Sequence, residues 1–464
     1  MCNVSLNGTQ PTDASIRVLR ALEAAGLEAW YVGGWVRDAL MGRPSHDVDM
    51  CCSGLWQESK AALEAADIAV VESGIKFGGI TAICDGERIE VTTYRLDGFY
   101  TDGRHPQSVE RAASLEDDLA RRDFTVNAMA WHPERGLVDR YDGQGDLKRK
   151  LIRAVGDPKR RFNEDALRML RAVRFACRLD FMIEPETKQA LAECAPLLDA
   201  VARERVGIEL EGILSTGHGG DAMLRYPELV CAAVPELAAG RGFDQRSVYH
   251  AFNVYEHIAR VLTVAGELAL CDGVAPSSSL MWAAFLHDVS KPECFTVDHD
   301  GSGHFYGHPE LGAKKARVIM DRLALSHDLV RDVCLLIKYH DKPLRPERSC
   351  LLNMMRALSG EGVDTPRLMD ELMDLKRADT LGKAPSCFYY VETIEEMRAL
   401  VHELLAAGEP YTLKMLAING GDLIRAGVKP GPELGQLLNA ALDAVIEKNI
   451  PNTRETLLAH LNLE

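Results

Sequence analysis

Two acidic residues separated by a single position, Asp47 and Asp49, carry the clearest candidate chemistry in the chain. Residues i and i+2 of a strand point to the same face, so this pair would project two carboxylates side by side, which a cation makes favourable. Oxygen ligands of this kind suit Mg²⁺, and two such ions can bind the attacking and leaving oxygens of a phosphoryl transfer. Glu90, in the apolar segment RIEVTTY, is the candidate third carboxylate.

Gly33 and Gly34 come between an apolar run, residues 27–32, and a predicted helix, residues 35–41. This order lets backbone N–H groups approach a triphosphate at the positive end of a helix, and Arg37 could pair with the phosphate oxygens. A Gly-Gly pair alone is most often an ordinary turn, and a lone Asp-x-Asp is most often a solvated loop. Their succession over one short segment favours a nucleotide site.

The segment RRDFTVN contains a second polar group, with Arg122, Asp123 and Asn127. Its two cations could hold a triphosphate, while the acid and the amide could bind ribose hydroxyls. A surface salt-bridge cluster is the commoner explanation of Arg-Arg-Asp on its own.

The segment EDALRMLRAVRF, residues 164–175, predicts one amphipathic helix with Glu164, Arg168 and Arg171 on its charged face. A solvated i,i+4 ion pair between Glu164 and Arg168 explains the pattern equally well. In the functional interpretation, Asp165 accepts from an exocyclic amino group and Arg168 donates to the neighbouring ring nitrogen. Cytosine and adenine offer that arrangement, whereas uracil and guanine offer the reverse, so one rigid pair would select C and A.

Histidines are concentrated in one part of the chain, because eight of the fourteen lie between residues 250 and 340. Among them, His287 and Asp288 are adjacent and follow an apolar run, residues 281–286. Imidazoles and carboxylates from separate helices can form a transition-metal or Mg²⁺ site, and a bound ion would lower the pKa of water for attack on a phosphoester. A lone His-Asp pair is accidental most of the time.

The elements that position these residues follow from hydrophobic patterning. Strands are predicted at 47–52, 69–72, 79–84 and 88–94, with Asp85-Gly86 as a hairpin turn between the last two. A helix is predicted over 16–25, and from about residue 145 the pattern is helical almost throughout. At roughly 150 residues per domain, the 464 residues predict three or four domains.

Composition constrains the partners and the compartment. The net charge of −16 argues against a polyanion-binding protein, but residues 147–178 hold eleven basic and three acidic residues, a local net charge of +8. The twelve cysteines are scattered without a Cys-x-x-Cys pair, which indicates reduced thiols. Neither a signal peptide nor a run of eighteen apolar residues is present, so we expect a cytoplasmic protein without a membrane span.

Seven segments together resemble the class II nucleotidyltransferases, which include CCA-adding tRNA nucleotidyltransferases and bacterial poly(A) polymerases. They are GGWVRDAL with SHDVDM, EVTTYR, TDGRHP (101–106), RRDFTVNAMA, EDALRMLRAVRF and RERVGIEL (203–210). The resemblance implies an α/β head with a polymerase-β-like sheet, followed by an all-α neck, body and tail. It favours the CCA-adding branch, because a Gly-Arg-Arg-Phe type of stretch, typical of the poly(A) polymerases, is missing after residue 76.

The resemblance also implies a role for each matching residue. Asp47 and Asp49 would hold Mg²⁺, with Glu90 as third catalytic carboxylate. Asp165 and Arg168 would read the base, positioned by Glu164. The other nucleotide-binding residues would be Gly33, Gly34, Arg37, Arg122, Asp123, Asn127, Arg171 and Arg174, and a flexible loop with Asp102 and Arg104 would help to switch from CTP to ATP.

The histidine-rich part resembles the HD phosphohydrolase superfamily, named after its adjacent His and Asp. The residues that fit the pattern are His257, His287, Asp288, His308, His340 and Asp379. The resemblance implies a site for a divalent transition metal or Mg²⁺. Such a domain either removes phosphates or cyclic phosphates from RNA ends or serves only to hold tRNA.

We therefore predict an enzyme that adds C, C and A to the 3′ end of tRNA from CTP and ATP. The expected divisions are a head at 1–146, a neck at 147–215, an HD-type domain at 216–385 and a tail at 386–464. The alternatives are a poly(A) polymerase or a partial CC- or A-adding enzyme, and, from another class, an HD phosphohydrolase with a nucleotide-binding head. The sequence leaves the oligomeric state open.

Overall fold

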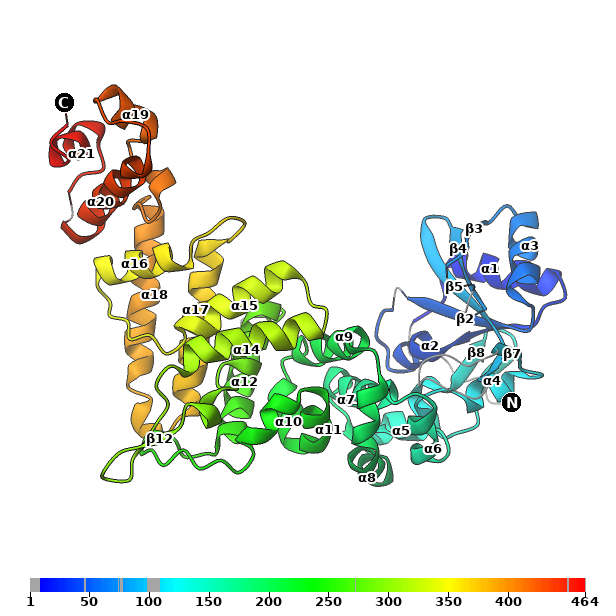
Figure 1. Ribbon diagram of the computed structural model, residues 1–464. Helices are drawn as coiled ribbons and strands as arrows, with labels where there is room; N and C mark the ends of the chain where they lie inside the picture. Colours follow the sequence, from blue (N-terminus) through cyan, green and yellow to red (C-terminus); the bar gives the residue numbers. More distant parts are fainter. Residues whose placement is uncertain are drawn as a thin grey trace. The chain divides into compact units, whose positions relative to one another are not determined.

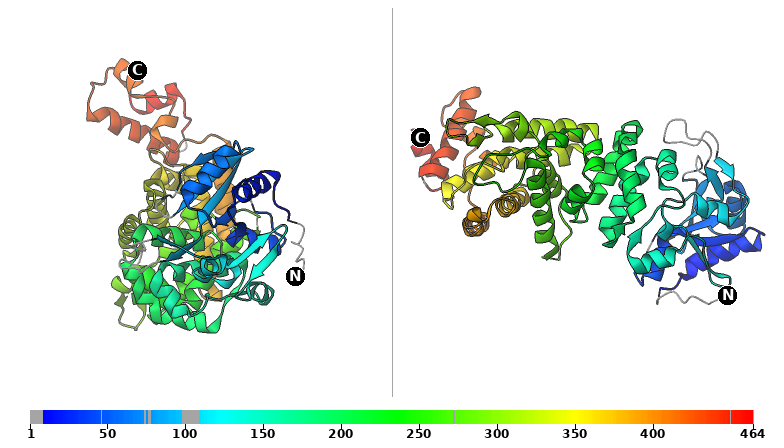
Figure 2. Two further views of the ribbon diagram at one scale, coloured as in Figure 1. Left: turned by 90° about the vertical axis from the view of Figure 1, so that its right-hand side faces the viewer. Right: turned by 90° about the horizontal axis from the view of Figure 1, so that it is seen from below.

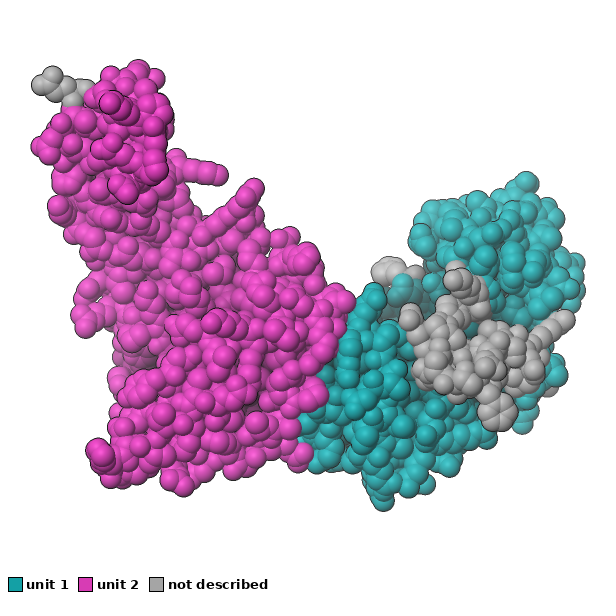
Figure 3. Space-filling view, viewed as in Figure 1, with its two compact units in different colours: residues 1–213, 226–233 teal, residues 214–225, 234–464 magenta. Residues whose placement is uncertain are grey.

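The computed structural model describes residues 9–45, 47–73, 75, 78–97, 109–271, 273–448 and 450–463. These residues form two compact units, shown in separate colours in Figure 3. The first comprises residues 1–213 and 226–233, and the second comprises residues 214–225 and 234–464. Asp102 and Arg104 lie outside the described residues.

A seven-stranded sheet forms the centre of the first unit, with strand order β3-β4-β5-β2-β1-β8-β9 (Figure 1). Within it, β2 and β5 pair in parallel and every other pair is antiparallel. The predicted turn at Asp85-Gly86 is confirmed, since both residues have positive φ, 50° and 84°, as a two-residue hairpin turn requires. The strands are β1 (Ala29–Val32), β2 (Val48–Cys52), β3 (Ala69–Val71), β4 (Gly79–Cys84), β5 (Glu87–Thr93), β8 (Met129–His132) and β9 (Gly136–Asp139).

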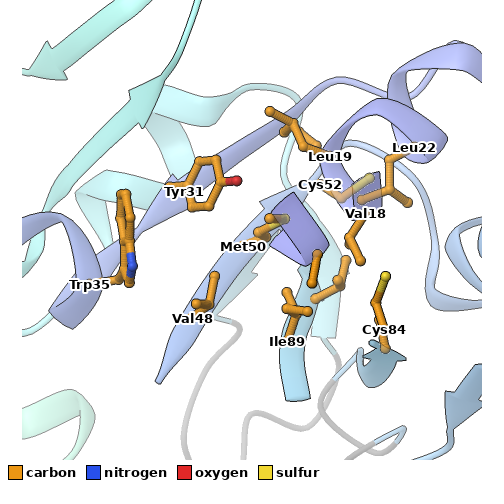
Figure 4. Close-up of a cluster of buried hydrophobic side chains, with 14 of the residues drawn as sticks. Val18, Leu19, Leu22, Tyr31, Trp35, Val48, Met50, Cys52, Cys84 and Ile89 are labelled. Carbon is orange, nitrogen blue, oxygen red and sulfur yellow. The ribbon is translucent and has the colours of Figure 1, made fainter. Parts of the chain in front are cut away.

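Alternation along β2 and β5 decides which side chains face the core and which face the site. Figure 4 shows Val48, Met50 and Cys52 of β2 on the face that packs against helix α1 (Asp13–Ala24). Ile89 of β5 joins the same buried cluster. Because neighbouring positions of a strand point to opposite faces, Asp49 of β2 and Glu90 of β5 lie on the other face of the sheet.

Short helices and strand pairs complete the first unit. A small antiparallel pair joins β6 (Arg95–Asp97) to β7 (Val109–Arg111), and a parallel pair joins β10 (Leu151–Ile152) to β11 (Met182–Ile183). The helices after α1 are α2 (Gly33–Leu40), α3 (Trp56–Ala65), α4 (Leu115–Ala120), α5 (Gly143–Arg149), α6 (Pro158–Glu164), α7 (Leu167–Leu179), α8 (Pro185–Cys194), α9 (Arg203–Leu214) and α11 (Pro227–Ala233).

The prediction of a single helix through residues 164–175 is wrong. Helix α6 ends at Glu164, Asp165 is extended with φ −147° and ψ 105°, and α7 begins at Leu167. The cause is local, because the Asp165 side chain accepts from the Leu167 N–H at 3.0 Å and so supports the start of a new helix.

The second unit is mainly helical (Figure 2). Its strands, among the residues that the structure describes, are one small pair, β12 (Thr296–Val297) with β13 (Gly303–His304). Leu423, Val445 and Leu457 contribute to a separate buried cluster near its end. Its helices are α10 (Gly219–Arg225), α12 (Val254–Cys271), α13 (Ser278–Leu286), α14 (His308–Arg322), α15 (His327–Tyr339), α16 (Arg348–Leu358), α17 (Thr365–Gly382), α18 (Tyr390–Ala406), α19 (Gly420–Arg425), α20 (Pro432–Lys448) and α21 (Arg454–His460). The predicted α/β head followed by an all-helical remainder is confirmed.

The cysteines and the helices agree with two further expectations. All eleven cysteines within the described ranges are free thiols. None of the helices within the same ranges is both long enough and apolar enough to span a membrane.

Candidate active site and metal centre

Three carboxylates lie together on the sheet face opposite α1. Asp49 of β2 pairs in register with Glu90 of β5, and Asp47 precedes the first residue of β2. Burial, with a further contribution from the charge of Glu90, raises the pKa of Asp49 to about 6. Carboxylates crowded in this way favour a bound cation, because a cation offsets both the lost solvation and the mutual repulsion.

The start of α2 brings backbone against these carboxylates. Gly33 is the first residue of α2 and has a φ of +67°, which only glycine adopts readily. A Cβ at this position would lie 3.0 Å from Arg122 Nη1 and 3.5 Å from Asp49 Oδ2. Gly33 is therefore required both for the turn and for the close approach of backbone to the acidic group, and Gly34 follows it in the same helix.

A buried acid on α4 holds the two arginines that face this group. Asp118 is fully buried, and its Oδ1 accepts from Arg121 at 2.5 Å and 3.0 Å. Its Oδ2 accepts from Arg122 at 3.1 Å and 3.3 Å. The sequence argument missed Asp118, although its i,i+3 and i,i+4 spacing to two successive arginines is a recognisable signal.

Four of the predicted nucleotide-binding residues form one hydrogen-bonded chain. Arg37 Nη1 donates to Asn127 Oδ1 at 2.7 Å, and Asn127 Nδ2 donates to Asp123 Oδ1 at 3.2 Å. Asp123 Oδ2 accepts from Arg171 at 2.7 Å and 3.0 Å. Burial alone would raise the pKa of Asp123, but Arg171 and its other partners hold it below its ordinary value.

The predicted base-reading pair lies at the junction of α6 and α7. Arg168 donates to Glu164 Oε2 at 2.8 Å, as the positioning role of Glu164 requires, and to the Arg121 carbonyl at 3.1 Å. Asp165 Oδ2 accepts from Arg205 of α9 at 3.1 Å. Arg205 was missed as a site residue, because its contact to Asp165 joins positions 40 residues apart.

These residues line one cavity of about 320 Å³, within the usual size range of small-ligand sites. Its charged lining residues are Asp49, Glu90, Arg95, Arg121, Arg122, Asp123, Asp165, Arg168, Arg171 and Arg205. Asp47 lines an adjoining cavity that shares Asp49 and Glu90.

Several predicted nucleotide-binding residues are held behind the cavity instead of lining it. Arg37 is only 3% exposed and forms two bonds of 2.9 Å to Asp38. Arg174 donates to Glu209 at 2.6 Å. The guanidinium groups of Arg37, Arg171 and Arg174 lie 5.1–5.4 Å from the ring centroid of Phe175. Direct phosphate contacts by Arg37 and Arg174 stay predictions, and the contacts present give both a positioning role.

In the second unit, the six residues of the His-Asp pattern come together in one buried cluster. They are His257 on α12, His287 and Asp288 directly after α13, His308 at the start of α14, His340 directly after α15, and Asp379 on α17. Asp288 Oδ2 lies 3.2 Å from His287 Nε2 and 3.3 Å from His257 Nε2. Asp288 Oδ1 lies 3.4 Å from His308 Nε2 and 3.7 Å from His340 Nε2.

The backbone fixes the tautomer of all four imidazoles. Nδ1 of His257, His287, His308 and His340 lies 2.7–3.2 Å from a backbone carbonyl, which can only accept. Each Nδ1 therefore carries a proton, and Nε2 of each ring faces the cluster. Metal-binding histidines are oriented in this manner by their second ring nitrogen.

The donor set fits divalent ions. Both oxygens of Asp288 are buried among the Nε2 atoms of the four histidines, and a cation bound between these atoms would attract both the carboxylate and the lone pairs of neutral imidazoles. Two overlapping groups have ligand geometry, one with His257 and His287 and one with His308 and His340, and Asp288 belongs to both. Lys291 Nζ lies 2.7 Å from Asp288 Oδ2.

Family models match almost all of the chain. The Poly A polymerase head domain matches residues 29–153, and the RNA and SrmB-binding site of polymerase A matches residues 180–239. The HD domain matches residues 254–383, and the tRNA nucleotidyltransferase domain 2 matches residues 386–461. The paired carboxylates, the arginine-rich cavity and these matches define a nucleotidyltransferase with an HD domain.

Relatives narrow the class to one family. The chain is 31% identical to the CCA-adding enzyme of Leuconostoc mesenteroides, over 95% of this chain and 93% of that protein. It is also 31% identical to the CCA-adding enzyme of Streptococcus mutans, over 97% and 96%. The chain belongs to the family of CCA-adding enzymes.

Solved structures agree with this assignment. The Bacillus stearothermophilus CCA-adding enzyme in complex with CTP has a TM-score of 0.71 and 26% identity to the chain, and covers 98% of each. The Thermotoga maritima CCA-adding enzyme complexed with tRNA-CCA shares the fold, with a TM-score of 0.61 and 21% identity.

Proposed function

We propose that the first unit transfers CMP, CMP and AMP from CTP and ATP to the 3′ end of tRNA. The observation that carries this proposal is one cavity holding both the Asp49–Glu90 pair and the Asp165–Arg168 pair. In each step, the RNA 3′ oxygen forms a bond to the α-phosphorus, the bond from that phosphorus to the bridging oxygen breaks, and pyrophosphate leaves. The membership in the CCA-adding family favours this reaction over poly(A) synthesis.

The charged residues of the cavity would have different roles in the reaction. Asp47 and Asp49 would hold Mg²⁺, and Glu90 would complete the acidic group. When bound, divalent ions supply positive charge next to the attacking and leaving oxygens. Arg121 and Arg122, fixed by Asp118, would pair with triphosphate oxygens.

The junction of α6 and α7 would select the base. Asp165 would accept from the exocyclic amino group of cytosine or adenine, and Arg168 would donate to the adjacent ring nitrogen. Glu164 and Arg205 hold this pair in place through bonds of 2.8 Å and 3.1 Å. Uracil and guanine would present a donor to Arg168 and an acceptor to Asp165, which both side chains disfavour.

Purified protein incubated with labelled CTP and ATP and a tRNA that lacks its terminal CCA tests this function. We expect addition of three nucleotides in the order C, C, A, dependent on a divalent metal. A long A tail would identify a poly(A) polymerase, and arrest after CC or addition of A alone would identify a partial enzyme. No incorporation at any Mg²⁺ concentration would overturn the transferase proposal.

A second activity is proposed for the histidine cluster, namely hydrolysis of phosphoesters at RNA ends. The sharing of Asp288 between two ligand groups supports it, because two neighbouring ions can hold both a nucleophilic water and the leaving oxygen. Beside the cluster lies a cavity of about 310 Å³ lined by Lys291 and Lys383, which carry the positive charge that a phosphate needs. His304 and Tyr306 stack at 5.3 Å along the same cavity and offer an aromatic surface to a base.

Metal-dependent phosphate release from RNA with a 2′,3′-cyclic phosphate end tests this activity. Replacing His287 and Asp288 with alanine should abolish the release and the metal content of the second unit, and should leave CCA addition intact. The matched control is His327→Ala, which removes an exposed histidine of α15 outside the cluster. Phosphate release that persists in the double variant would contradict the assignment.

A further inference from the structure

A second cavity adjoins the acidic group from the side away from the base-reading residues. It has a volume of about 700 Å³, and it shares Asp49 and Glu90 with the nucleotide cavity. Its other lining residues include Asp47 and Arg88, which precede the shared pair along β2 and β5. The nucleotide cavity instead continues along the same strands past Asp49 and Glu90, to Met50 and Thr92. The carboxylates therefore separate two spaces.

The geometry of phosphoryl transfer requires two such spaces. The attacking and leaving oxygens lie roughly in line on opposite sides of the phosphorus. If the triphosphate lies with Arg121 and Arg122, the attacking 3′ hydroxyl has to approach the carboxylates from the other side. The second cavity is the space that the structure provides there, and its volume is large enough for a nucleotide.

Arg88 is the basic residue of this cavity. It is exposed, lies two positions before Glu90 on the same face of β5, and forms no ion pair with any residue that the structure describes. Its acidic neighbour Glu87 also lines the cavity, and the Glu87 carboxylate accepts from the Thr12 hydroxyl at 2.7 Å. At about 3.3 Å per residue, Arg88 is about 7 Å from Glu90 along the strand, within reach of a phosphate next to a hydroxyl bound at the carboxylates.

We propose that this cavity binds the 3′-terminal nucleotide of the RNA and that Arg88 binds the last phosphodiester. This inference rests on the proposed transferase function and assigns the acceptor side of the same site. An unpaired guanidinium is suited to it, because it can donate two parallel hydrogen bonds to phosphate oxygens. The surrounding carboxylates repel RNA, so one cation next to the sugar–phosphate backbone also orients the strand end.

The test is a double-mutant cycle, which combines a substitution in the protein with removal of a charge from the RNA. We expect Arg88→Ala to lower kcat/KM for a tRNA ending before CCA by about 10- to 100-fold, with the KM for CTP changed less than about twofold. A tRNA with a neutral methylphosphonate at its last linkage should impose the same loss on the wild-type enzyme and no further loss on Arg88→Ala. Arg88→Lys, which keeps the charge, should recover part of the activity.

Arg17→Ala is the matched control, because Arg17 pairs with Asp85 of the neighbouring turn at 3.1 Å and does not line the cavity. It should leave kcat/KM for the tRNA unchanged. An equal methylphosphonate penalty in wild type and Arg88→Ala, or an unchanged kcat/KM in Arg88→Ala, would overturn the inference. Failure of the wild-type enzyme to extend any tRNA would instead overturn the transferase function.

Discussion

At the scale of single residues, Asp165 shows how the side chain that we propose reads the base is held in place. Its Oδ1 accepts from the Leu167 N–H at 3.0 Å, and its Oδ2 accepts from Arg205 at 3.1 Å. Each carboxylate oxygen has two lone pairs, so both contacts can persist while the side chain accepts from a base. The two hydrogen bonds therefore fix the orientation of the carboxylate and leave it able to accept another.

Asp165→Ala should relax base selection. Removing a charge-assisted hydrogen bond of about 1.5–3 kcal/mol should raise incorporation from UTP or GTP relative to CTP by about tenfold or more, with tRNA affinity unchanged. Incorporation from each nucleotide in turn measures this, and Asp199→Ala, which alters an exposed acid paired with Arg203, is the control. Retained selectivity for C and A would show that Asp165 does not read the base.

The raised pKa of Asp49 predicts how metal binding depends on pH. Below about pH 6 the carboxyl is protonated in the metal-free site, and a divalent ion has to displace that proton. The apparent Mg²⁺ affinity, measured as the concentration for half-maximal CMP incorporation, should therefore weaken as the pH falls below about 6 and level off at higher pH. A constant affinity between pH 5 and 8 would contradict the direction of this shift.

At the scale of elements, patterning predicted β2, β3, β4 and β5, because two constraints act on such strands at once, but it did not predict β8 and β9. Residue alternation places Val48, Met50 and Ile89 in the core, and the Asp85-Gly86 turn fixes the register of β4 with β5. The break between α6 and α7 at Asp165 was not predicted, because the amphipathic pattern assumes one continuous helix. It takes no account of the hydrogen bond that the Asp165 side chain accepts from the nearby Leu167 N–H. The sequence also does not show how deeply a side chain is buried. It therefore could not distinguish Arg37, which is buried behind the cavity, from Arg122, which lines it.

Gly33→Ala tests the close approach at the start of α2. The substitution strains a backbone at φ +67° and places a Cβ 3.0 Å from Arg122. We expect kcat to fall by at least about tenfold, while thermal unfolding changes by only about 1 kcal/mol. Gly26→Ala, at φ +78° with no atom within 4 Å of the new Cβ, isolates the cost of backbone strain. Equal activity losses in both variants would exclude the proposed contact.

Asp118→Asn tests the support that α4 gives to the arginines. Leaving Arg121 and Arg122 without their buried partner should cost about 3 kcal/mol in unfolding of the first unit and raise the KM for CTP. Burial raises the pKa of Asp118, but Arg122 and Arg121 lower it overall, so this stability is present above the unfolded pKa of about 4 and is lost as pH falls through the lower folded value. Calorimetry at several pH values measures it.

The control for Asp118 is Glu116→Gln, which changes an exposed pair with Arg140 at 2.9 Å. It should alter unfolding by less than about 1 kcal/mol and leave the KM for CTP unchanged. A similar effect of both substitutions would argue against a special role for the buried acid.

At the scale of the whole molecule, the basic segment 147–178 contributes less free charge than its composition indicates. Arg149, Arg161 and Arg174 are each paired with an acid, at 2.5–2.6 Å. The counterparts lie in other segments in two of the three cases, so only the folded structure reveals the pairing. The local net charge of +8 therefore overstates the free positive charge that RNA would encounter at this segment.

Unpaired cations of this segment should dominate the salt dependence of tRNA binding. Lys148 is exposed and forms no ion pair with the described residues, whereas Lys159 lies 2.5 Å from Glu193. Lys148→Ala should reduce the slope of log Kd against log salt by about 1, and Lys159→Ala should reduce it clearly less. Filter binding between 50 and 300 mM salt, on the order of physiological values, measures both, and equal slopes would contradict the argument.

The parallel pairing of β2 with β5 has a consequence for how related chains can differ in length. Asp49 and Glu90 meet because their strands are in register, while the intervening chain forms α3, β3 and β4. Insertions or deletions in the connections between those elements leave the register intact. One residue added inside β5 would turn Glu90 towards the core and Ile89 towards the acidic group. Insertions and deletions among homologues should therefore occur between β2 and β5 and not within these two strands.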